Sequence, residues 1–418
     1  MTYENSRSFA QSLDKNDDLS SFRSKYIIPK HEGRDVFYFT GNSLGLQPVK
    51  AKQYLIEELE DWGKYGVEGH FQSRRNWFGY HHFLTEKAAK IVGAKTDEVA
   101  VMNTLSVNLN LLMVSFYRPE GKRTKIVMEA AAFPSDHYAV QQQVKFHKLN
   151  PDEHILLLHP RENEYCIRTE DILDMMEKHQ DEIALVMLGG VNYYTGQFFD
   201  ISTITKKAHE IGALAGFDLA HAAGNIVLKL HDWNVDFACW CSYKYLNSGP
   251  GGVASIFVHE RHGNNPNLPR FAGWWGNDES SRFQMKSEFI PAIGASGWQQ
   301  SNAQIFSMAV HLASLELFDE VGMERLRMKS EKLTGYLEFL IQEISQIQII
   351  TPSNPEERGC QLSLIALERP KELFQFLQNN GIIADWREPD VIRVAPVPMY
   401  NQFEDCWELA ESIKRFYN

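Results

Sequence analysis

The sequence predicts an α/β protein with a large domain, built on a mostly parallel sheet flanked by helices, and a smaller α+β domain at the C-terminus. Three observations favour this class. Between about residues 98 and 260, short apolar runs alternate with helix-length amphipathic segments, the pattern of a parallel sheet covered by helices. After residue 300, helical periodicity dominates and short strand-like pieces follow. The length of 418 residues is too great for one compact core and suits two domains of unequal size.

The expected strands of the large domain are its short apolar runs. They cover residues 125–128, 155–158, 183–188, 215–218 and 235–241. Helix-length segments lie between several of them, at residues 169–180 and 202–212. We therefore expect strand and helix to alternate along this part of the chain.

The C-terminal part shows two helical repeats of apolar residues and then two strand-like pieces. The repeats are Ile305, Met308, Leu312 and Leu315, then Leu333, Tyr336, Leu337, Leu340, Ile341 and Ile344, and the strand-like pieces are residues 361–366 and 391–394. These patterns predict three parts: an N-terminal segment, residues 1–45, that packs with the small domain; a large domain, residues 46–305; and a small domain, residues 306–418.

Composition excludes several classes of protein. The 42 Lys and Arg against 54 Asp and Glu give a formal charge of -12, which argues against general nucleic-acid binding. Charged residues fill positions 1–20, where a signal peptide would be apolar, and the longest apolar runs have the length of strands. The five cysteines are odd in number and lack zinc-site spacing. We expect a cytoplasmic protein with free thiols and no membrane partner.

An apolar strand ends abruptly at Lys244 and is followed by the glycine-rich residues 247–252. An unpaired ammonium group is unfavourable in a buried position. A lysine that forms a Schiff base with a carbonyl group has a function in such a place. The alternative is a lysine whose long side chain reaches solvent from the end of the strand.

A second apolar strand ends at Asp218, 26 residues before Lys244. A carboxylate there can keep a pyridine nitrogen protonated, and His221 can contact the ring oxygen or a phosphate. The alternative is a helix-capping aspartate with a surface histidine. Because open α/β sheets bind ligands at the carboxyl ends of their strands, Asp218 and Lys244 together favour a cofactor site.

A phosphate site is expected beside them. Residues 102–108 place hydroxyl groups before the helix-like run 109–116, and the start of a helix directs N–H groups and a positive dipole end toward an anion. Serine and threonine also cap helices where no ligand binds. Phe133 follows another strand, and its ring either stacks on a pyridine or belongs to the core.

Taken together, these residues resemble the kynureninase family of fold-type-I pyridoxal-phosphate enzymes, in the aspartate-aminotransferase superfamily. The resemblance covers roughly residues 35–405. It rests on GNSLGLQP at 41–48, FPSDHY at 133–138, YTGQ at 194–197, SYKYLN at 242–247, AGWWG at 272–276 and RVAPVP at 393–398.

The resemblance implies a role for individual residues. Lys244 would be the Schiff-base lysine, Asp218 the partner of the pyridinium nitrogen, and Phe133 the residue that stacks on the ring. The implied cofactor-binding residues are Leu105, Ser106, Phe133, Pro134, Ser135, Asp136, Asp218, His221, Tyr243, Lys244, Trp274 and Asn302. The implied substrate-binding residues are Ser43, His70, Ser301, Asn302 and Arg393, with Arg393 on the substrate carboxylate.

The implied reaction is hydrolysis of the Cβ–Cγ bond of 3-hydroxykynurenine or kynurenine. The products are alanine and 3-hydroxyanthranilate or anthranilate, in tryptophan catabolism or in the supply of a precursor of NAD. Lys244 would remove the α-proton, and Tyr243 would either protonate the β-carbon or only bind the phosphate. His70 would lie beside the aromatic ring of the substrate and favour 3-hydroxykynurenine. The resemblance also implies a homodimer with shared sites, in which Trp274 or Asn302 reaches the phosphate of the neighbour.

The chain departs from the family at three positions, one of which is Ala303, after the retained polar pair Ser301 and Asn302, where a proline is expected. Ser106 stands where members often carry threonine, which retains the hydroxyl group. Gly189 stands where many members carry a hydroxyl residue, so one hydrogen bond to the cofactor is expected to be absent or replaced by water.

Two other classes of function compete with this interpretation. One is another enzyme of the same fold, such as a cysteine desulfurase or an aminotransferase; Cys360, the candidate nucleophile, leads directly into a strand and is expected to be buried. The other is a silent scaffold or a regulator, for which the sequence offers no basic helix-turn-helix. No metal site is expected, because His81 and His82 are adjacent and should point apart on a helix surface.

Overall fold

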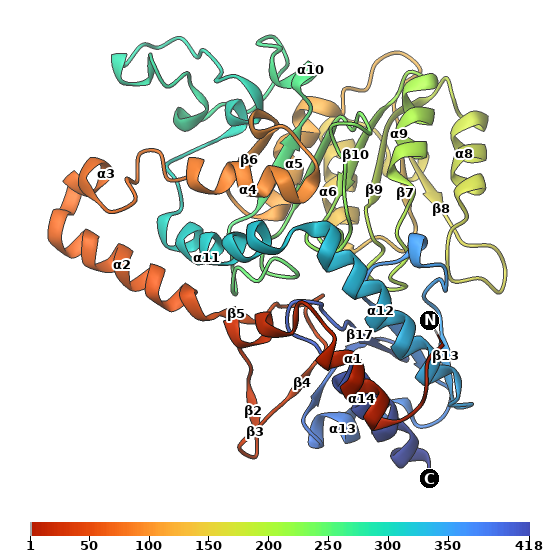
Figure 1. Ribbon diagram of the computed structural model, residues 1–418. Helices are drawn as coiled ribbons and strands as arrows, with labels where there is room; N and C mark the ends of the chain where they lie inside the picture. Colours follow the sequence, from red (N-terminus) through yellow and green to blue (C-terminus); the bar gives the residue numbers. More distant parts are fainter. Residues whose placement is uncertain (1) are drawn as a thin grey trace.

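A computed structural model describes residues 2–418 (Figure 1). Within these residues, the larger part is built on a seven-stranded sheet with the order β6–β12–β11–β10–β9–β7–β8. β12 runs antiparallel to both of its neighbours, and the other pairings are parallel. The strands are β6 (Val99–Val101), β7 (Lys125–Glu129), β8 (Ile155–Leu158), β9 (Ile183–Gly189), β10 (Leu214–Asp218), β11 (Phe237–Trp240) and β12 (Ser255–Val258).

Helices cover both faces of this sheet because its strands are apolar on both sides. Val127 and Phe217 belong to a core shared with one set of helices: α4 (His82–Val92), α8 (Thr169–Lys178), α9 (Ile201–Glu210) and α11 (Ile305–Val321). Ile126 and Cys239 belong to a core shared with α5 (Leu105–Phe116) and α6 (Pro134–Phe146) on the other face. The predicted mostly parallel sheet with helices on its faces is confirmed.

The five predicted strands agree with β7 to β11 to within two residues at each end. β6 and β12 were not among them. Both are short, with three and four residues, and neither is followed by the long amphipathic segment that marks a strand–helix unit.

The second part of the molecule is a four-stranded sheet in the order β13–β14–β17–β16, antiparallel throughout. It consists of β13 (Ile347–Ile349), β14 (Leu362–Ala366), β16 (Asp385–Arg387) and β17 (Val391–Val394), packed with α12 (Met323–Gln342), α13 (Pro370–Asn379) and α14 (Phe403–Tyr417). α1 (Arg7–Lys15) lies against α14, and Phe39 enters the same core.

The two parts are joined through consecutive helices. α11 packs into the larger core, and α12 passes from that core at Leu326 into the second one at Leu333. The N-terminal segment touches both cores, through Phe22 in the first and Phe39 in the second. The domain limits at 45/46 and 305/306 stay predictions.

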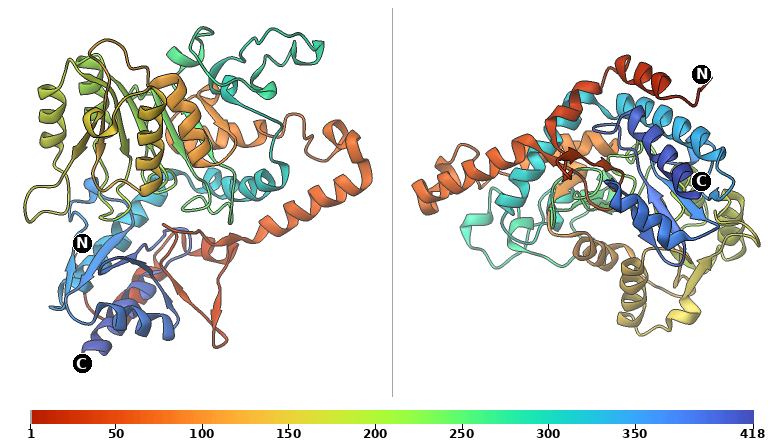
Figure 2. Two further views of the ribbon diagram at one scale, coloured as in Figure 1. Left: turned by 180° about the vertical axis from the view of Figure 1, so that it is seen from behind. Right: turned by 90° about the horizontal axis from the view of Figure 1, so that it is seen from below.

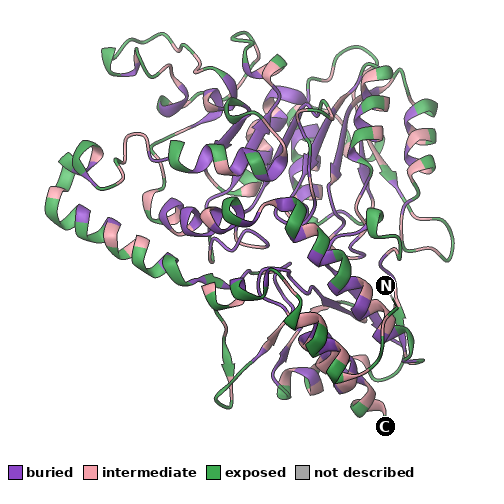
Figure 3. Cartoon of the chain, viewed as in Figure 1, coloured by how far each residue is buried: buried purple, intermediate pink, exposed green. Residues whose placement is uncertain are grey.

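One element leaves the body of the molecule. α2 (Val49–Tyr65) extends outward as an arm and carries α3 (Gly69–Gln72) at its tip (Figures 1 and 2). Much of the arm is exposed (Figure 3), including Trp62 and Phe71 at 57% and 68%. An exposed row of large apolar side chains is typical of a surface that another protein covers. Among residues 2–418, no helix combines the length and the apolar character needed to cross a membrane.

Candidate active site

A cavity of about 190 Å³ lies at the carboxyl edge of the large sheet. Because parallel strands end at the same edge, residues far apart in the sequence meet there. Glu129, Gly189 and Asp218 are the last residues of β7, β9 and β10. The residues that line the cavity are Leu105, Ser106, Glu129, Phe133, Ser135, Asp136, Gly189, Val191, Tyr193, Asp218, Ala220, His221, Tyr243 and Lys244.

Lys244 faces this cavity and does not simply extend into solvent. Its Nζ lies 3.0 Å from Nε2 of His221 and 5.8 Å from the centre of the Phe133 ring. The backbone around it is held by the loop of residues 41–45. The N–H of Gly45 donates to the carbonyl of Tyr243 at 2.8 Å, and a Cβ at Gly45 would lie 2.3 Å from the Lys244 carbonyl. A glycine is therefore required where this loop meets the lysine.

Asp218 is buried at the end of β10, and its Oδ1 accepts the N–H of Ala220 at 2.8 Å. The carboxyl group of Asp136 is its hydrogen-bonding neighbour. Burial and the negative charge of Asp218 raise the pKa of Asp136 well above its usual value, which favours a protonated Asp136 that can donate to Asp218. Burial raises the pKa of Asp218 as well, while the Ala220 N–H and the charge of Lys244 oppose that rise.

Glu129 is a third carboxyl group in the cavity, and the sequence analysis did not identify it. Both of its oxygens lie within 3.2 Å of the Gly189 nitrogen, and burial raises its pKa to about 7. A Cβ at residue 189 would lie 2.9 Å from Oε1 of Glu129. The glycine at position 189 thus makes room for the Glu129 carboxyl group. No spacing in the sequence signals this contact, because the two residues are brought together only when β7 pairs with β9.

His221 and Tyr243 are the remaining polar groups beside the lysine. Burial, followed by the charges of Lys244 and Arg393, holds the pKa of His221 well below its usual value, so the imidazole is neutral. Its Nδ1 has no hydrogen-bond partner in the part of the chain that the structure describes. Burial raises the pKa of Tyr243, which therefore remains a phenol and a hydrogen-bond donor.

The N-terminal ends of α5 and α6 complete the cavity. Leu105 and Ser106 form the first turn of α5, and the side chain of Thr104 does not cap it within residues 2–418. N–H groups of that turn are therefore available to an anion. Pro134, Ser135 and Asp136 open α6 directly after Phe133, a residue that is 44% exposed.

These residues fit pyridoxal phosphate. The start of α5 suits the phosphate, Phe133 offers a ring face for stacking, and the paired carboxyl groups suit a pyridine nitrogen. Nδ1 of His221 offers one more polar atom without a partner among residues 2–418. Lys244 supplies the amine that a carbonyl cofactor requires.

Arg393 is buried on β17 in the second sheet. Its guanidinium donates to the carbonyl of Tyr193 at 2.6 Å and pairs with Asp385. Its Nε has no partner among residues 2–418. Tyr193 lines the cavity and Arg393 does not, so Tyr193 lies between the cavity and Arg393 of the second sheet. Cys360, the candidate nucleophile of the alternative interpretation, is 1% exposed, and burial raises its pKa to about 12.

The other predicted site residues lie outside the cavity wall. His70 is on α3 at the tip of the arm, with its ring 5.7 Å from Trp77. Trp274 is 46% exposed, and Ser301 and Asn302 are exposed on the loop before α11. Ser43 lies in the loop of residues 41–45, where its N–H donates to Thr40. The structure thus brings most of the predicted cofactor residues together, but not Trp274 or Asn302, and none of the predicted substrate residues lines the cavity.

The expectation that His81 and His82 point apart is wrong. Their ring centres are 4.1 Å apart, and His81 is buried rather than on the helix surface. His81 precedes the first turn of α4, where no earlier turn restricts its side-chain rotamer. The two rings are therefore free to turn toward one another.

The sequence of the chain is similar to those of known proteins. A family model described as the Kynureninase C-terminal domain matches residues 326–413. A protein named Kynureninase from Flavobacterium johnsoniae is 54% identical over 420 residues, which cover 99% of each chain. A protein of the same name from Myxococcus xanthus is 54% identical over 415 residues, 99% of this chain and 97% of that one.

Solved structures of lower identity share the fold. The cystine C-S lyase C-DES superimposes with a TM-score of 0.75 at 16% identity, over 90% of this chain and 96% of that chain. A cysteine desulfurase from Thermococcus onnurineus gives a TM-score of 0.74 at 17% identity, over 91% and 94%. The predicted fold-type-I architecture is confirmed.

Proposed function

The chain belongs to the kynureninase family, and from this premise we propose that it prefers 3-hydroxykynurenine and cleaves it in the cavity around Lys244. The enzyme is a pyridoxal-phosphate-dependent hydrolase of a carbon–carbon bond, and kynurenine cleavage belongs to tryptophan catabolism. One observation carries the choice of site: Asp218, at the end of β10, and Lys244, in the loop after the neighbouring β11, meet in one cavity with the start of α5.

When bound, the cofactor withdraws electrons from the substrate Cα and from the bond that breaks. The residues of the chain bind it and move protons around it. The first turn of α5 holds the phosphate, and Asp218 accepts a hydrogen bond from the ring nitrogen while Asp136 donates to Asp218. Lys244 then removes the α-proton of the substrate. Neutral His221 accepts from Lys244 Nζ at 3.0 Å and keeps that amine directed into the cavity.

Tyr243 is the proposed proton donor to the β-carbon after cleavage. Its raised pKa keeps the proton on the phenol, and its ring centre lies 6.0 Å from Lys244 Nζ. A donor that stays protonated until a carbanion forms is suited to this step. The same phenol can instead donate to the phosphate. A variant that retains cofactor affinity but loses turnover would favour the first role.

Arg393 is the proposed partner of the substrate carboxylate. It is held by Asp385 and by the Tyr193 carbonyl, and its Nε has no partner in residues 2–418. A buried guanidinium with a free N–H is a strong site for a carboxylate.

The preference for 3-hydroxykynurenine rests on His70 together with Ser301 and Asn302. An imidazole leaves room beside a substituted ring and offers it a hydrogen-bond partner. A site built to bond a hydroxyl group rejects the analogue that lacks it, because its own polar groups are then left unpaired.

Steady-state kinetics with both kynurenines test this preference. We expect a higher kcat/KM for 3-hydroxykynurenine, and a ratio that falls about tenfold in His70→Trp, the value of one hydrogen bond. Phe71→Trp adds an indole at an exposed neighbouring position on α3 and should leave the ratio unchanged. Equal kcat/KM values in the unmodified enzyme would refute the preference.

We also propose that the enzyme is a cytoplasmic homodimer whose sites combine residues of both chains. The separation of His70, Trp274 and Asn302 from the cavity of their own chain supports shared sites. The exposed apolar residues of the arm support a protein partner for that surface. The five cysteines are free in the described chain, which accords with a reducing compartment.

A further inference from the structure

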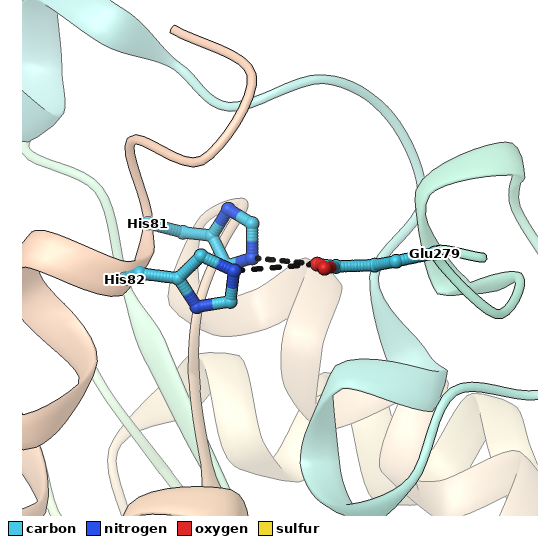
Figure 4. A group of neighbouring side chains, drawn as sticks. All are labelled: His81, His82 and Glu279. Atoms are coloured by element: carbon cyan, nitrogen blue, oxygen red, sulfur yellow. Dashed lines mark ion pairs between the residues drawn. The ribbon is translucent and has the colours of Figure 1, made fainter. Parts of the chain in front are cut away.

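A cluster of two histidines and a glutamate lies away from the cofactor cavity, where the start of α4 meets the loop after Trp274. Figure 4 shows the imidazole rings of His81 and His82 side by side, each with a nitrogen directed at the carboxylate of Glu279. Nε2 of His82 is 3.3 Å from Oε1 of Glu279, and Nε2 of His81 is 3.8 Å from the same oxygen. The chemistry assigned to the enzyme so far uses none of these three residues.

His81 is the unusual member of this cluster. Its side chain is 3% exposed, and neither ring nitrogen has a hydrogen-bond partner among residues 2–418. Burying an unpaired polar group is costly, so such a group in a folded protein calls for a ligand.

We propose that His81, His82 and Glu279 bind a divalent first-row transition-metal ion such as Zn²⁺. Two imidazole nitrogens and one carboxylate oxygen form a ligand set that this class of ion prefers, with water in a fourth position. Ligands about 2.0–2.1 Å from a tetrahedral ion are about 3.3–3.4 Å from one another. The two observed separations from the glutamate oxygen lie at this value and slightly above it. A bound ion satisfies Nε2 of His81, whereas Nδ1 keeps no protein partner.

A second group of histidine and glutamate side chains lacks the unpaired nitrogens that mark the first group as a metal site. Glu98, His231 and His259 are also close together. Oε1 of Glu98 already accepts from the Glu260 N–H at 2.9 Å and lies 2.9 Å from Nδ1 of His231. Nδ1 of His259 accepts the Arg261 N–H. These atoms are satisfied by the protein itself, and they call for no ion.

A cation and two carboxylates lie near one another at the proposed site. Arg282 is the nearby cation, and its guanidinium is held by the carbonyls of Trp275 and Asn277 and lies over the Trp275 ring. Burial lowers the pKa of Arg282, whereas the negative charges of Glu279 and Asp278 raise it. A metal ion would fasten the start of α4 to the loop that carries Trp274, so its binding should raise the thermal stability of the enzyme.

Equilibrium dialysis of the holoenzyme against Zn²⁺, with metal counted per chain, tests the site directly. We expect one saturable ion per chain and an affinity at least about tenfold lower in His82→Gln and in Glu279→Gln, since even an outer partner of a metal site causes a loss of that size. Glu288→Gln, an exposed glutamate on the same loop, is the matched control and should bind normally.

Two further measurements make the result decisive. Co²⁺ in place of Zn²⁺ should give the visible absorption of a four-coordinate ion in the unmodified protein and lose it in both ligand variants. Zn²⁺ should raise the Tm of the unmodified protein and of the control but of neither ligand variant. Absence of saturable binding, or equal binding in all four proteins, would show that His82 and Glu279 form an ion pair only and would overturn the proposal.

Discussion

At Asp218 the proposed site depends on one charge placed against a ring nitrogen. Asp218→Asn keeps the shape of the group and removes its charge. Loss of a charge-assisted hydrogen bond typically costs about 1.5–3 kcal/mol, so cofactor affinity should fall about 10- to 100-fold. The loss of turnover at saturating cofactor should be larger, since a neutral ring accepts electrons poorly. Cofactor titration and kcat together measure both effects.

Asp232→Asn is the control for this change, because Asp232 is exposed and outside the cavity. It should leave both quantities unaltered. Turnover close to normal in Asp218→Asn would contradict the assignment.

Glu129 should make the stability of the cofactor-free protein depend on pH. Burial raises its pKa from 4.5 in the unfolded chain to about 7 in the folded one, so the folded protein holds this proton more tightly. This proton therefore stabilises the folded protein fully below pH 4.5, and the stabilisation is lost as the pH rises through 7. At about 1.4 kcal/mol per unit of pKa, the loss is up to about 3 kcal/mol. Glu129→Gln should therefore gain stability relative to the unmodified protein between pH 5 and 7.5.

Urea unfolding of the two cofactor-free proteins across this range measures the difference. Glu288→Gln, at an exposed position, should follow the unmodified protein at every pH. A constant difference between Glu129→Gln and the unmodified protein would contradict the raised pKa.

For single residues, sequence patterns pointed to the cavity residues that follow apolar strands. Lys244 and Asp218 stand out because each terminates an apolar run, and Phe133 follows another. Glu129 did not stand out, because its place opposite Gly189 depends on the pairing of two strands that are distant in sequence. His81 was misjudged for a similar reason, since its burial depends on a loop some 200 residues later.

At the scale of elements, the loop of residues 41–45 is expected to hold the lysine segment in place. In Gly45→Ala the new Cβ would lie 2.2 Å from Oδ1 of Asn247 and 2.3 Å from the Lys244 carbonyl. Either the loop or the lysine segment must move. We expect a loss of at least about 1–3 kcal/mol in the free energy of unfolding, typical of overpacking, together with weaker cofactor binding.

Gly63→Ala provides the comparison. Gly63 lies on the exposed side of α2, and a Cβ there would meet nothing within 4 Å among residues 2–418. Alanine favours a helix over glycine by about 0.5–1 kcal/mol, so this variant should be slightly more stable. Equal stability of the two variants in urea unfolding would contradict the close contact at Gly45.

The elements themselves were predictable where the apolar pattern was long and bounded by helices. The strands from β7 to β11 follow this pattern, and so do α11 and α12. β6 and β12 were not predicted, because each is short and they pair antiparallel to one another, outside the strand–helix units. The projecting helix α2 was not predicted: it packs against α11, with the Trp62 ring 6.0 Å from that of Phe306, and its far end with α3 extends beyond the body of the molecule (Figure 1).

At the scale of the whole molecule, shared active sites predict that two inactive variants complement each other. Lys244→Ala and Trp274→Ala should each have little activity as a homodimer. In a dimer of one chain of each kind, one of the two sites receives both native residues. Co-expression with two different tags and purification of the mixed dimer should recover about half of the normal activity per dimer, as expected for a two-fold symmetric pair. Mixed dimers as inactive as the parents would contradict shared sites.

Chemical labelling of the holoenzyme shows which lysine holds the cofactor, and we predict that it is Lys244. Borohydride reduction of the holoenzyme fixes the link between the cofactor and its lysine, and peptide mapping by mass spectrometry then identifies that residue. The structure directs Nζ of Lys244 into the cavity between Phe133 and His221. We predict a pyridoxyl group on Lys244, in the peptide that contains residues 242–247. A pyridoxyl group on any other lysine would show that Lys244 does not hold the cofactor.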